Sequence, residues 1–310
     1  MIAGTKLLKN LDNLISRRPV TAQIQLCNFC NNFCNYCRYV GVPVDQKRSI
    51  AISEFISYVQ SLLKLGVKGF ILTGGEPTIS KDFDKITEWL ESNEIPYGIN
   101  TNFNVLKLIK PRYLKISLDG FDSESYIQDR KIDKYETVIS NIVKYLEWKK
   151  ENNIQTAVGI QKIGMDVESC KRFYEAHCNL NVDYMSFRPV ESVNHVFYDT
   201  HDEKPVVEFL ERLRERDKRV HINYKYYQTR MCFERRYGNF LQIAVNPFGQ
   251  VIYCCSKSNE IIGNVTEPDI LEKIAAFKTD MSTCPVPCRM TGPNAIVKDM
   301  ETIENDSMFI

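Results

Sequence analysis

Short apolar runs alternate with longer amphipathic stretches over the first 188 residues of the chain. The apolar runs have the length of buried β-strands, and the amphipathic stretches repeat their apolar residues at helical spacing. Six strands are predicted: Thr21–Leu26, Gly69–Thr73, Tyr97–Asn100, Tyr113–Leu118, Gln155–Gln161 and Asp183–Phe187. Because strand and helix patterns alternate, we expect an α/β fold with a parallel sheet and right-handed crossovers, curved into a partial (β/α)6 TIM-like barrel.

Two of the intervening helices have clear ends. Ser53 is predicted to cap a helix that stops before Gly66, and a longer helix begins near Tyr135 and stops near Asn152. In parallel α/β sheets, functional side chains gather at the carboxyl ends of the strands. The loops that follow the predicted strands are therefore where a site is expected.

The pattern changes beyond the sixth predicted strand. Residues 204–219 have the pattern of a charged surface helix, and Leu241–Val245 and Gln250–Tyr253 flank a four-residue turn, which predicts a β-hairpin. We therefore predict two domains, a barrel over residues 1–200 and a small hairpin and helix extension over residues 201–310.

Composition and charge set the broad class of the protein. The chain has 310 residues, of which 44% are hydrophobic and 25% charged, and its formal net charge is +1. These values are ordinary for a globular protein, and so small a net charge disfavours nucleic acid or an anionic membrane as a partner. No run has the roughly 20 apolar residues of a spanning helix, and the first nine residues lack the apolar core of a signal peptide. We expect a cytoplasmic protein.

Eleven cysteines are many for a reducing compartment, where disulfides have little use, unless several bind metal. Cys30, Cys34 and Cys37 follow the first predicted strand with C-x3-C-x2-C spacing. Three thiolates so spaced can hold three corners of a 4Fe-4S cluster and leave the fourth iron open. A tetrahedral zinc site that adds Cys27 is the alternative, although zinc sites usually pair two C-x2-C knuckles across a longer loop. Cys27 is otherwise interpreted as structural.

The cysteine segment, with Tyr36 before the third cysteine, resembles the cluster motif of the radical S-adenosylmethionine (radical SAM) superfamily. Gly74-Gly75-Glu76-Pro77, after the second predicted strand, is similar to the GGEP element of that superfamily, although a GGEP tetrapeptide alone also suits an ordinary turn. The resemblance implies that the open iron chelates SAM. One electron then cleaves SAM to methionine and a 5′-deoxyadenosyl radical, which abstracts hydrogen from a substrate.

The resemblance also implies roles for further residues. Cys30, Cys34 and Cys37 become the catalytic cluster ligands. Ser117 lies where related enzymes approach the ribose, and Arg130 where they place a residue for the SAM carboxylate, although each residue alone would be unremarkable. Gln161 and Arg188, at the ends of the fifth and sixth predicted strands, could also face the cavity, but either could equally be structural. The implied SAM-binding residues are Tyr36, Gly74, Gly75, Glu76, Pro77, Ser117, Asp119 and Arg130. A flavodoxin- or ferredoxin-type protein is the implied reductant.

A second set of cysteines follows the barrel pattern. With the predicted hairpin, it resembles the SPASM or twitch extension, which houses auxiliary iron-sulfur clusters. A full SPASM domain has more cysteines and two clusters, so one auxiliary 4Fe-4S cluster is expected here, while a zinc site would suit four cysteines equally well. The predicted ligands are Cys232, Cys254, Cys284 and Cys288, with Cys255 as a competitor for the place of Cys254.

Three functions are weighed. The first is a radical SAM oxidoreductase that dehydrogenates a small molecule, with the auxiliary cluster accepting an electron. The second is a maturase that modifies or crosslinks a ribosomally made peptide, although the roughly twenty residues before the first predicted strand are short for a leader-binding winged-helix domain. The third, a non-catalytic iron-sulfur carrier, is disfavoured by the intact open-site motif with GGEP. Nucleic-acid modification is disfavoured because no basic stripe interleaved with aromatics is evident.

Overall fold

The computed structural model describes residues 12–13, 16–37, 40–164, 166–189, 204–223, 241–254 and 257–279. Six parallel strands form the centre of its sheet and lie side by side in chain order. They are β1 (Thr21–Gln25), β2 (Gly69–Thr73), β3 (Tyr97–Thr101), β4 (Tyr113–Ser117), β5 (Ala157–Ile163) and β6 (Tyr184–Arg188). The predicted α/β fold with a curved parallel sheet is confirmed.

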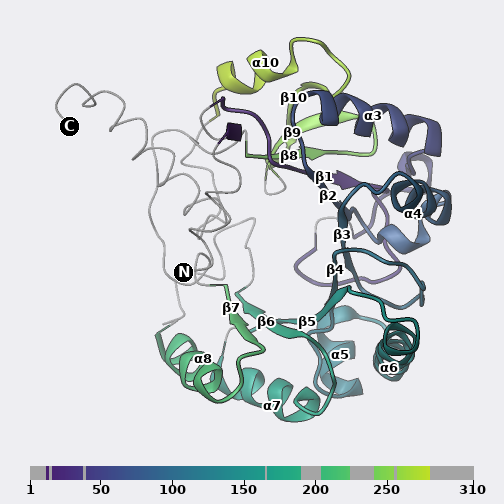
Figure 1. Cartoon of the computed structure of the whole chain (residues 1–310). Helices are drawn as coiled ribbons and strands as arrows, with labels where there is room; N and C mark the ends of the chain where they lie inside the picture. Colours follow the sequence, from purple (N-terminus) through teal and green to yellow (C-terminus); the bar gives the residue numbers. More distant parts are fainter. Residues whose placement is uncertain are drawn as a thin grey trace.

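Helices cover the outer face of this curved sheet (Figure 1). The α-helices of the described residues include α3 (Ile52–Lys64), α4 (Phe83–Ser92), α5 (Ser123–Arg130), α6 (Tyr135–Glu151), α7 (Val167–His177), α8 (Lys204–Arg216) and α10 (Ile270–Ala276). Two short 3-10 helices, η1 (Val44–Gln46) and η2 (Pro77–Ile79), follow the loops after β1 and β2. Within the described ranges, no helix has the length and apolar character needed to cross a bilayer.

The hydrophobic core lies between the sheet and these helices. On β4, Leu114 and Ile116 are fully buried in this core, whereas Lys115 and Ser117 are only partly buried. Since successive strand residues point to opposite faces, the second pair faces the inner side of the curved sheet. The same alternation places polar side chains of the neighbouring strands on that inner side.

The predicted hairpin is present, but it joins the main sheet. Strand β8 (Gln242–Val245) pairs parallel with β1, and β9 (Gln250–Cys254) and β10 (Lys257–Asn264) follow antiparallel. At the opposite edge β7 (Val220–Ile222) pairs parallel with β6. The sheet order is β10-β9-β8-β1-β2-β3-β4-β5-β6-β7 and therefore runs across residue 200. The division into two domains at that residue stays a prediction.

One predicted helix start is wrong. Helix α3 is capped by Ala51 and not by Ser53, which lies inside the helix. The carboxylate of Glu54 accepts a hydrogen bond from Ala51 N at 3.0 Å, and Asp82 Oδ2 accepts one from Ile52 N at 3.0 Å. These two carboxylates satisfy the N–H groups of the N-cap residue and of the first helical residue, so the helix can begin ahead of Ser53 without a capping hydroxyl.

Candidate active site

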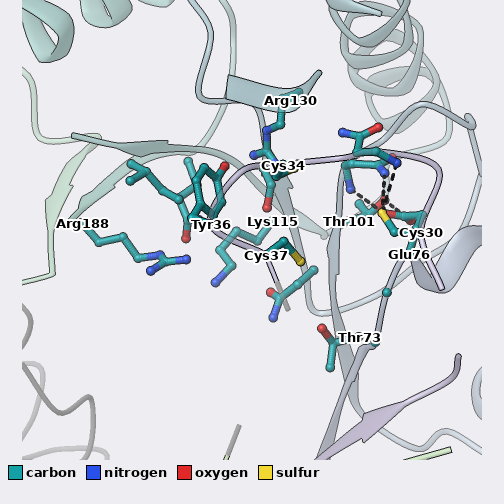
Figure 2. A pocket seen from close by; sticks show the side chains of 18 residues that line it. Cys30, Cys34, Tyr36, Cys37, Thr73, Glu76, Thr101, Lys115, Arg130 and Arg188 are labelled. Atoms are coloured by element: carbon teal, nitrogen blue, oxygen red, sulfur yellow. Dashed lines mark hydrogen bonds between the residues drawn. The ribbon is translucent and has the colours of Figure 1, made fainter. Parts of the chain in front are cut away.

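A cavity of about 280 Å³ opens at the carboxyl ends of the parallel strands. All three cysteines of the C-x3-C-x2-C segment line it, together with the turn after β2, the end of β3 and inner-face residues of β4, β5 and β6. Figure 2 shows these side chains around the cavity. Both motifs therefore line a cavity at the edge of the sheet where the sequence predicts a site.

No disulfide bond joins Cys30, Cys34 and Cys37 to one another. Cys30 is partly buried, and its sulfur accepts a hydrogen bond from Asn32 N at 3.3 Å and from Asn102 Nδ2 at 3.7 Å. Burial raises the pKa of the Cys30 thiol to about 12, and the Asn32 N–H acts in the opposite direction. Cys37 N donates to Cys34 O at 3.0 Å, which folds the segment back on itself.

Cys27 is separate from this group. It is fully buried, and its sulfur lies 3.3 Å from Phe29 O and 3.2 Å from Glu76 O, as a thiol donating to carbonyls would. Burial raises its pKa to about 11. Cys27 does not line the cavity. Its position suits the structural interpretation better than a zinc site of four cysteines.

Two glycines allow the loops after β1 and β2 to touch through their backbones. Gly75 N donates to Cys27 O at 2.8 Å, and Glu76 N donates to Phe29 O at 3.0 Å. A Cβ on Gly75 would lie 1.8 Å from Phe29 O, and one on Gly74 would lie 2.4 Å from Cys27 O. Gly74 also has φ +140°, in the region that favours glycine. No other residue fits this contact without moving the cysteine loop.

The Glu76 side chain joins the turn after β2 to the end of β3. It is 1% exposed, and its carboxylate accepts hydrogen bonds from Thr78 N (3.1 Å), Thr78 Oγ1 (2.6 Å), Thr101 Oγ1 (2.6 Å) and Asn102 N (2.7 Å). Figure 2 draws bonds of this group as dashed lines. Burial raises the pKa of Glu76, and the four donors oppose that effect. The carboxylate thus fixes the wall of the cavity against which the glycine turn rests.

Three residues predicted to bind SAM contact one another. Arg130 is 5% exposed, forms an ion pair with the fully buried Asp119, and donates from Nη1 to Cys34 Sγ at 3.3 Å. Tyr36 donates from its hydroxyl to Asp119 Oδ2 at 2.5 Å, and Asp119 Oδ1 accepts from Ile163 N at 2.7 Å. Burial lowers the pKa of Arg130, but Asp119, Tyr36 and Cys34 more than offset this and leave it raised. The Arg130 guanidinium, itself held by Asp119, therefore fixes the position of the Cys34 side chain.

The residues present fit an open-site cluster and SAM. The donor set is three thiols that line one cavity, which is the ligand count that leaves an iron open. Among the described residues, buried polar atoms without a hydrogen-bond partner include Asn32 Nδ2, Asn100 Oδ1 and Arg130 Nε. Asn32 and Asn100 line the cavity, so a polar ligand there would find an amide donor and an acceptor.

Not all of the residues predicted to bind SAM line the cavity. Ser117 lines the cavity, whereas Asp119 and Pro77 are buried and do not. Reasoning from the sequence missed Lys115, which also lines the cavity. It lies two residues before Ser117 on the same strand, so the period-two alternation of a strand could have identified it.

The second cysteine set cannot be placed. Cys232, Cys255, Cys284 and Cys288 lie outside the described residues, and of Cys254 only its membership of β9 is described. The auxiliary site therefore stays a prediction.

Comparison with known proteins supports the identification of the motifs. Residues 24–173 match the sequence pattern of the radical SAM superfamily. The GTP 3′,8-cyclase of Pasteurella multocida (strain Pm70) is 26% identical over 192 residues, which cover 58% of this chain and 54% of that protein. A probable GTP 3′,8-cyclase of Pyrococcus abyssi (strain GE5 / Orsay) is 33% identical over 135 residues, which cover 41% and 44%. The chain thus spans about half the length of these two relatives.

Solved structures share the fold. Streptococcus suis SuiB bound to S-adenosylmethionine superimposes with a TM-score of 0.67 at 14% identity, covering 86% of this chain and 70% of that one. SuiB bound to the precursor peptide SuiA gives a TM-score of 0.67 at 13% identity, covering 96% and 78%. At such low identity the likeness extends to the fold and no further.

Proposed function

We propose that this chain, whose residues 24–173 belong to the radical SAM superfamily, cleaves SAM reductively and takes a hydrogen atom from a small-molecule substrate. One observation carries the proposal: the three spaced cysteines and the Gly74-Gly75 turn line one cavity. The turn closes on the cysteine loop through backbone contacts that only glycine permits. This shared cavity and close contact support the proposal that the two motifs act as a single site.

Cys30, Cys34 and Cys37 would hold three irons of a 4Fe-4S cluster. When bound, such a cluster supplies the one electron that splits a C–S bond of SAM, giving methionine and a 5′-deoxyadenosyl radical that becomes 5′-deoxyadenosine on taking a substrate hydrogen. The hydrogen bond from Arg130 to Cys34 Sγ would fix the second ligand in place. Hydrogen bonds to cluster sulfurs also adjust reduction potential.

The same cavity would position SAM. Because Gly74 and Gly75 have no side chains, the methionine end of SAM could approach their backbone closely. Asn32 Nδ2 and Asn100 Oδ1 could supply a hydrogen-bond donor and an acceptor that have no partner in the structure. Ser117, at the end of β4, is the proposed ribose contact. The Glu76 carboxylate already has four donors in this structure, so we assign its contribution, with that of Pro77, to holding the turn. Tyr36, Asp119 and Arg130 would act mainly through the position of Cys34.

A small-molecule substrate is favoured by the names of the curated relatives, which are GTP 3′,8-cyclases. We further propose a net oxidation, in which the substrate radical passes its second electron to an auxiliary cluster held by Cys232, Cys254, Cys284 and Cys288. A flavodoxin- or ferredoxin-type protein would supply the first electron. Peptide modification is the second candidate, because SuiB, which shares the fold, was solved with a precursor peptide.

Anaerobic reconstitution of single-cysteine variants tests the assignment of the two cysteine sets. The wild type should bind about eight irons per chain, and Cys30→Ala and Cys288→Ala should each bind about four. Cys30→Ala should yield no 5′-deoxyadenosine, whereas Cys288→Ala should still yield it. Cys178→Ala is the matched control, since Cys178 lies at the end of α7 away from the cavity, and should match the wild type. Identical behaviour of the Cys30 and Cys288 variants would contradict the division of roles.

A further inference from the structure

A short loop after β3 carries two asparagine side chains that reach the cysteine loop. Asn102 Nδ2 donates to Asn31 Oδ1 at 2.7 Å, and Asn104 Nδ2 donates to Asn32 Oδ1 at 2.6 Å. Phe103, between the two donors, has φ +60° and is 1% exposed. A bulky residue in this left-handed conformation is strained, and it persists only where the surrounding contacts fix it. The carboxamides on either side of this turn therefore meet the segment between the first and second cysteines.

Asn102 is the member of this pair that also reaches a cysteine. It is 5% exposed, and its Nδ2 donates to Cys30 Sγ at 3.7 Å. Its Oδ1 accepts a hydrogen bond from Asn104 N at 3.0 Å, which fixes the orientation of the carboxamide. An amide NH2 group has two hydrogens, and Asn31 Oδ1 and Cys30 Sγ accept one each. The Cys30 sulfur is therefore approached by the donor end of the side chain.

The backbone of Asn102 connects the same residue to the glycine turn. Asn102 N donates to Glu76 Oε2 at 2.7 Å, and Glu76 is 1% exposed. One residue thus contacts both the first cysteine and the turn that closes on the cysteine loop. Because its backbone N–H and its Oδ1 are both bonded, the fold itself sets the position of Nδ2 beside Cys30 Sγ.

We propose that Asn102 is a positioning residue that donates a hydrogen bond to the Cys30 thiolate of the bound 4Fe-4S cluster and so raises the reduction potential of that cluster. The inference rests on the proposed function, because it assumes a cluster on Cys30, Cys34 and Cys37. A donor at a ligand sulfur stabilises the negative charge that one-electron reduction adds, and such bonds are among the factors that set iron–sulfur potentials. Asn32 N also donates to this sulfur, at 3.3 Å, but the side-chain donor is the one that substitution can remove.

A hydrogen bond to SAM is the alternative use of this donor. Asn102 lines the cavity, so a ligand there could lie within its reach. Both hydrogens of Nδ2, however, already have acceptors on the cysteine loop. A bond to SAM would require one of these contacts to break, so the geometry favours the sulfur.

A redox titration followed by electron paramagnetic resonance tests the inference without relying on turnover. Reconstituted proteins are reduced stepwise with titanium(III) citrate, and the signal that is absent from Cys30→Ala is assigned to the first cluster. Asn102→Leu should make one-electron reduction of that cluster about tenfold less favourable, which is a shift of about 59 mV to lower potential, because a hydrogen bond to a charged group is lost.

A second variant keeps the local turn while removing the donor. The shorter side chain in Asn102→Ser retains an acceptor for Asn104 N but loses the reach to Cys30 Sγ, so the potential should shift in the same direction. Both variants should retain the iron of the first cluster. Loss of that iron in both would show that Asn102 only holds the loop, and would overturn the inference.

Asn104→Leu is the matched control. It removes a carboxamide of the same loop that bonds Asn32 Oδ1 at 2.6 Å, and the other side-chain partner within the described ranges is the Tyr126 hydroxyl at 3.3 Å. Its equilibrium constant for cluster reduction should stay within about threefold of the wild-type value, because no donor to a cysteine sulfur is removed. The inference is wrong if both Asn102 variants keep the wild-type potential, or if Asn104→Leu shifts it as far as they do.

Two further outcomes separate this inference from the proposed function. If Asn102→Leu keeps the wild-type potential but binds labelled SAM tenfold more weakly in equilibrium dialysis, the donor serves SAM and the inference is wrong. If the wild type has the Cys30-dependent signal yet never forms 5′-deoxyadenosine, the proposed function is wrong, whereas the measured potentials still decide the role of Asn102.

Discussion

Arg130 has contacts that the sequence did not indicate. The resemblance assigned it to the SAM carboxylate, which stays a prediction, and in the structure its guanidinium also bonds Cys34 Sγ and pairs with Asp119. The sequence shows that an arginine follows the fourth predicted strand at the expected distance. It does not show that Asp119, eleven residues earlier, has φ +58° and is turned inward to meet it. Such side-chain partners depend on tertiary packing.

Removal of this arginine should destabilise the fold through the carboxylate that it leaves behind. Arg130→Met should lower the free energy of unfolding by about 3–5 kcal/mol, because Asp119 becomes a buried charge without its ion partner. Adding Asp119→Asn should recover most of that loss, as measured by thermal unfolding of the reconstituted proteins.

A surface ion pair provides the control for this cycle. Arg172→Met, which removes the exposed pair with Asp122, should cost no more than about 1 kcal/mol. If the changes in unfolding free energy caused by the Arg130 and Asp119 substitutions are additive, the two side chains are not coupled as their contacts indicate.

His177 should make stability depend on pH. It is 1% exposed and bonds Phe173 O and the Tyr135 hydroxyl, and burial lowers its pKa from 6.5 to about 4. The unfolded chain therefore binds a proton below pH 6.5 that the folded chain does not, so stability is lost as the pH falls from about 6.5 toward 4. Between pH 7.5 and 5.5 the loss should be roughly 1–2 kcal/mol.

Thermal unfolding at several pH values checks this dependence. His177→Gln should have a flatter profile than the wild type over that range. His221→Gln, at an exposed position of β7, should keep the wild-type slope. If His177→Gln and the wild type lose the same stability as the pH falls, another group is responsible for the pH dependence.

At the scale of elements, the turn after β2 sets the geometry of the cysteine loop. Gly75→Ala should displace that loop, because its Cβ would meet Phe29 O at 1.8 Å and Phe29 C at 2.3 Å. We expect the variant to fold but to bind less than half of the wild-type iron at the first cluster. Iron analysis after reconstitution measures this.

Gly69→Ala, at the first residue of β2, is the control. Its Cβ would meet Pro96 O at 3.6 Å, an ordinary contact, so iron binding should be unchanged. A full iron complement in Gly75→Ala would mean that the close backbone approach does not control the cluster site.

The elements were largely predictable, but their non-local pairing was not. Strand β2 lies where its apolar run predicts, and the other five parallel strands are shifted by no more than two residues. The hairpin β8–β9 was also evident from local pattern. Nothing local indicates that Gln242 pairs beside Thr21, because a parallel pairing over so long a separation depends on the whole sheet. The start of α3 was mispredicted for a similar reason, because its first N–H, that of Ile52, donates to Asp82, which lies 30 residues later in the chain.

At the scale of the whole molecule, the curved sheet brings chemistry from distant segments to one edge. The cysteines follow β1, the glycine turn follows β2, and the cations Lys115 and Arg188 lie on β4 and β6 around the same cavity. In Figure 1 the parallel strands form an arc with the helices outside it. A flat sheet would spread these groups too far apart for one ligand set. The fold thus explains why the motifs, far apart in sequence, can act together.

Formation of 5′-deoxyadenosine tests the central claim most directly. Wild-type protein with a full complement of iron is incubated anaerobically with SAM and dithionite, and the products are separated by liquid chromatography with mass detection. The account predicts 5′-deoxyadenosine and methionine in equal amounts, dependent on dithionite and absent in Cys30→Ala. Well-reconstituted wild-type protein that leaves SAM intact under these conditions would contradict it.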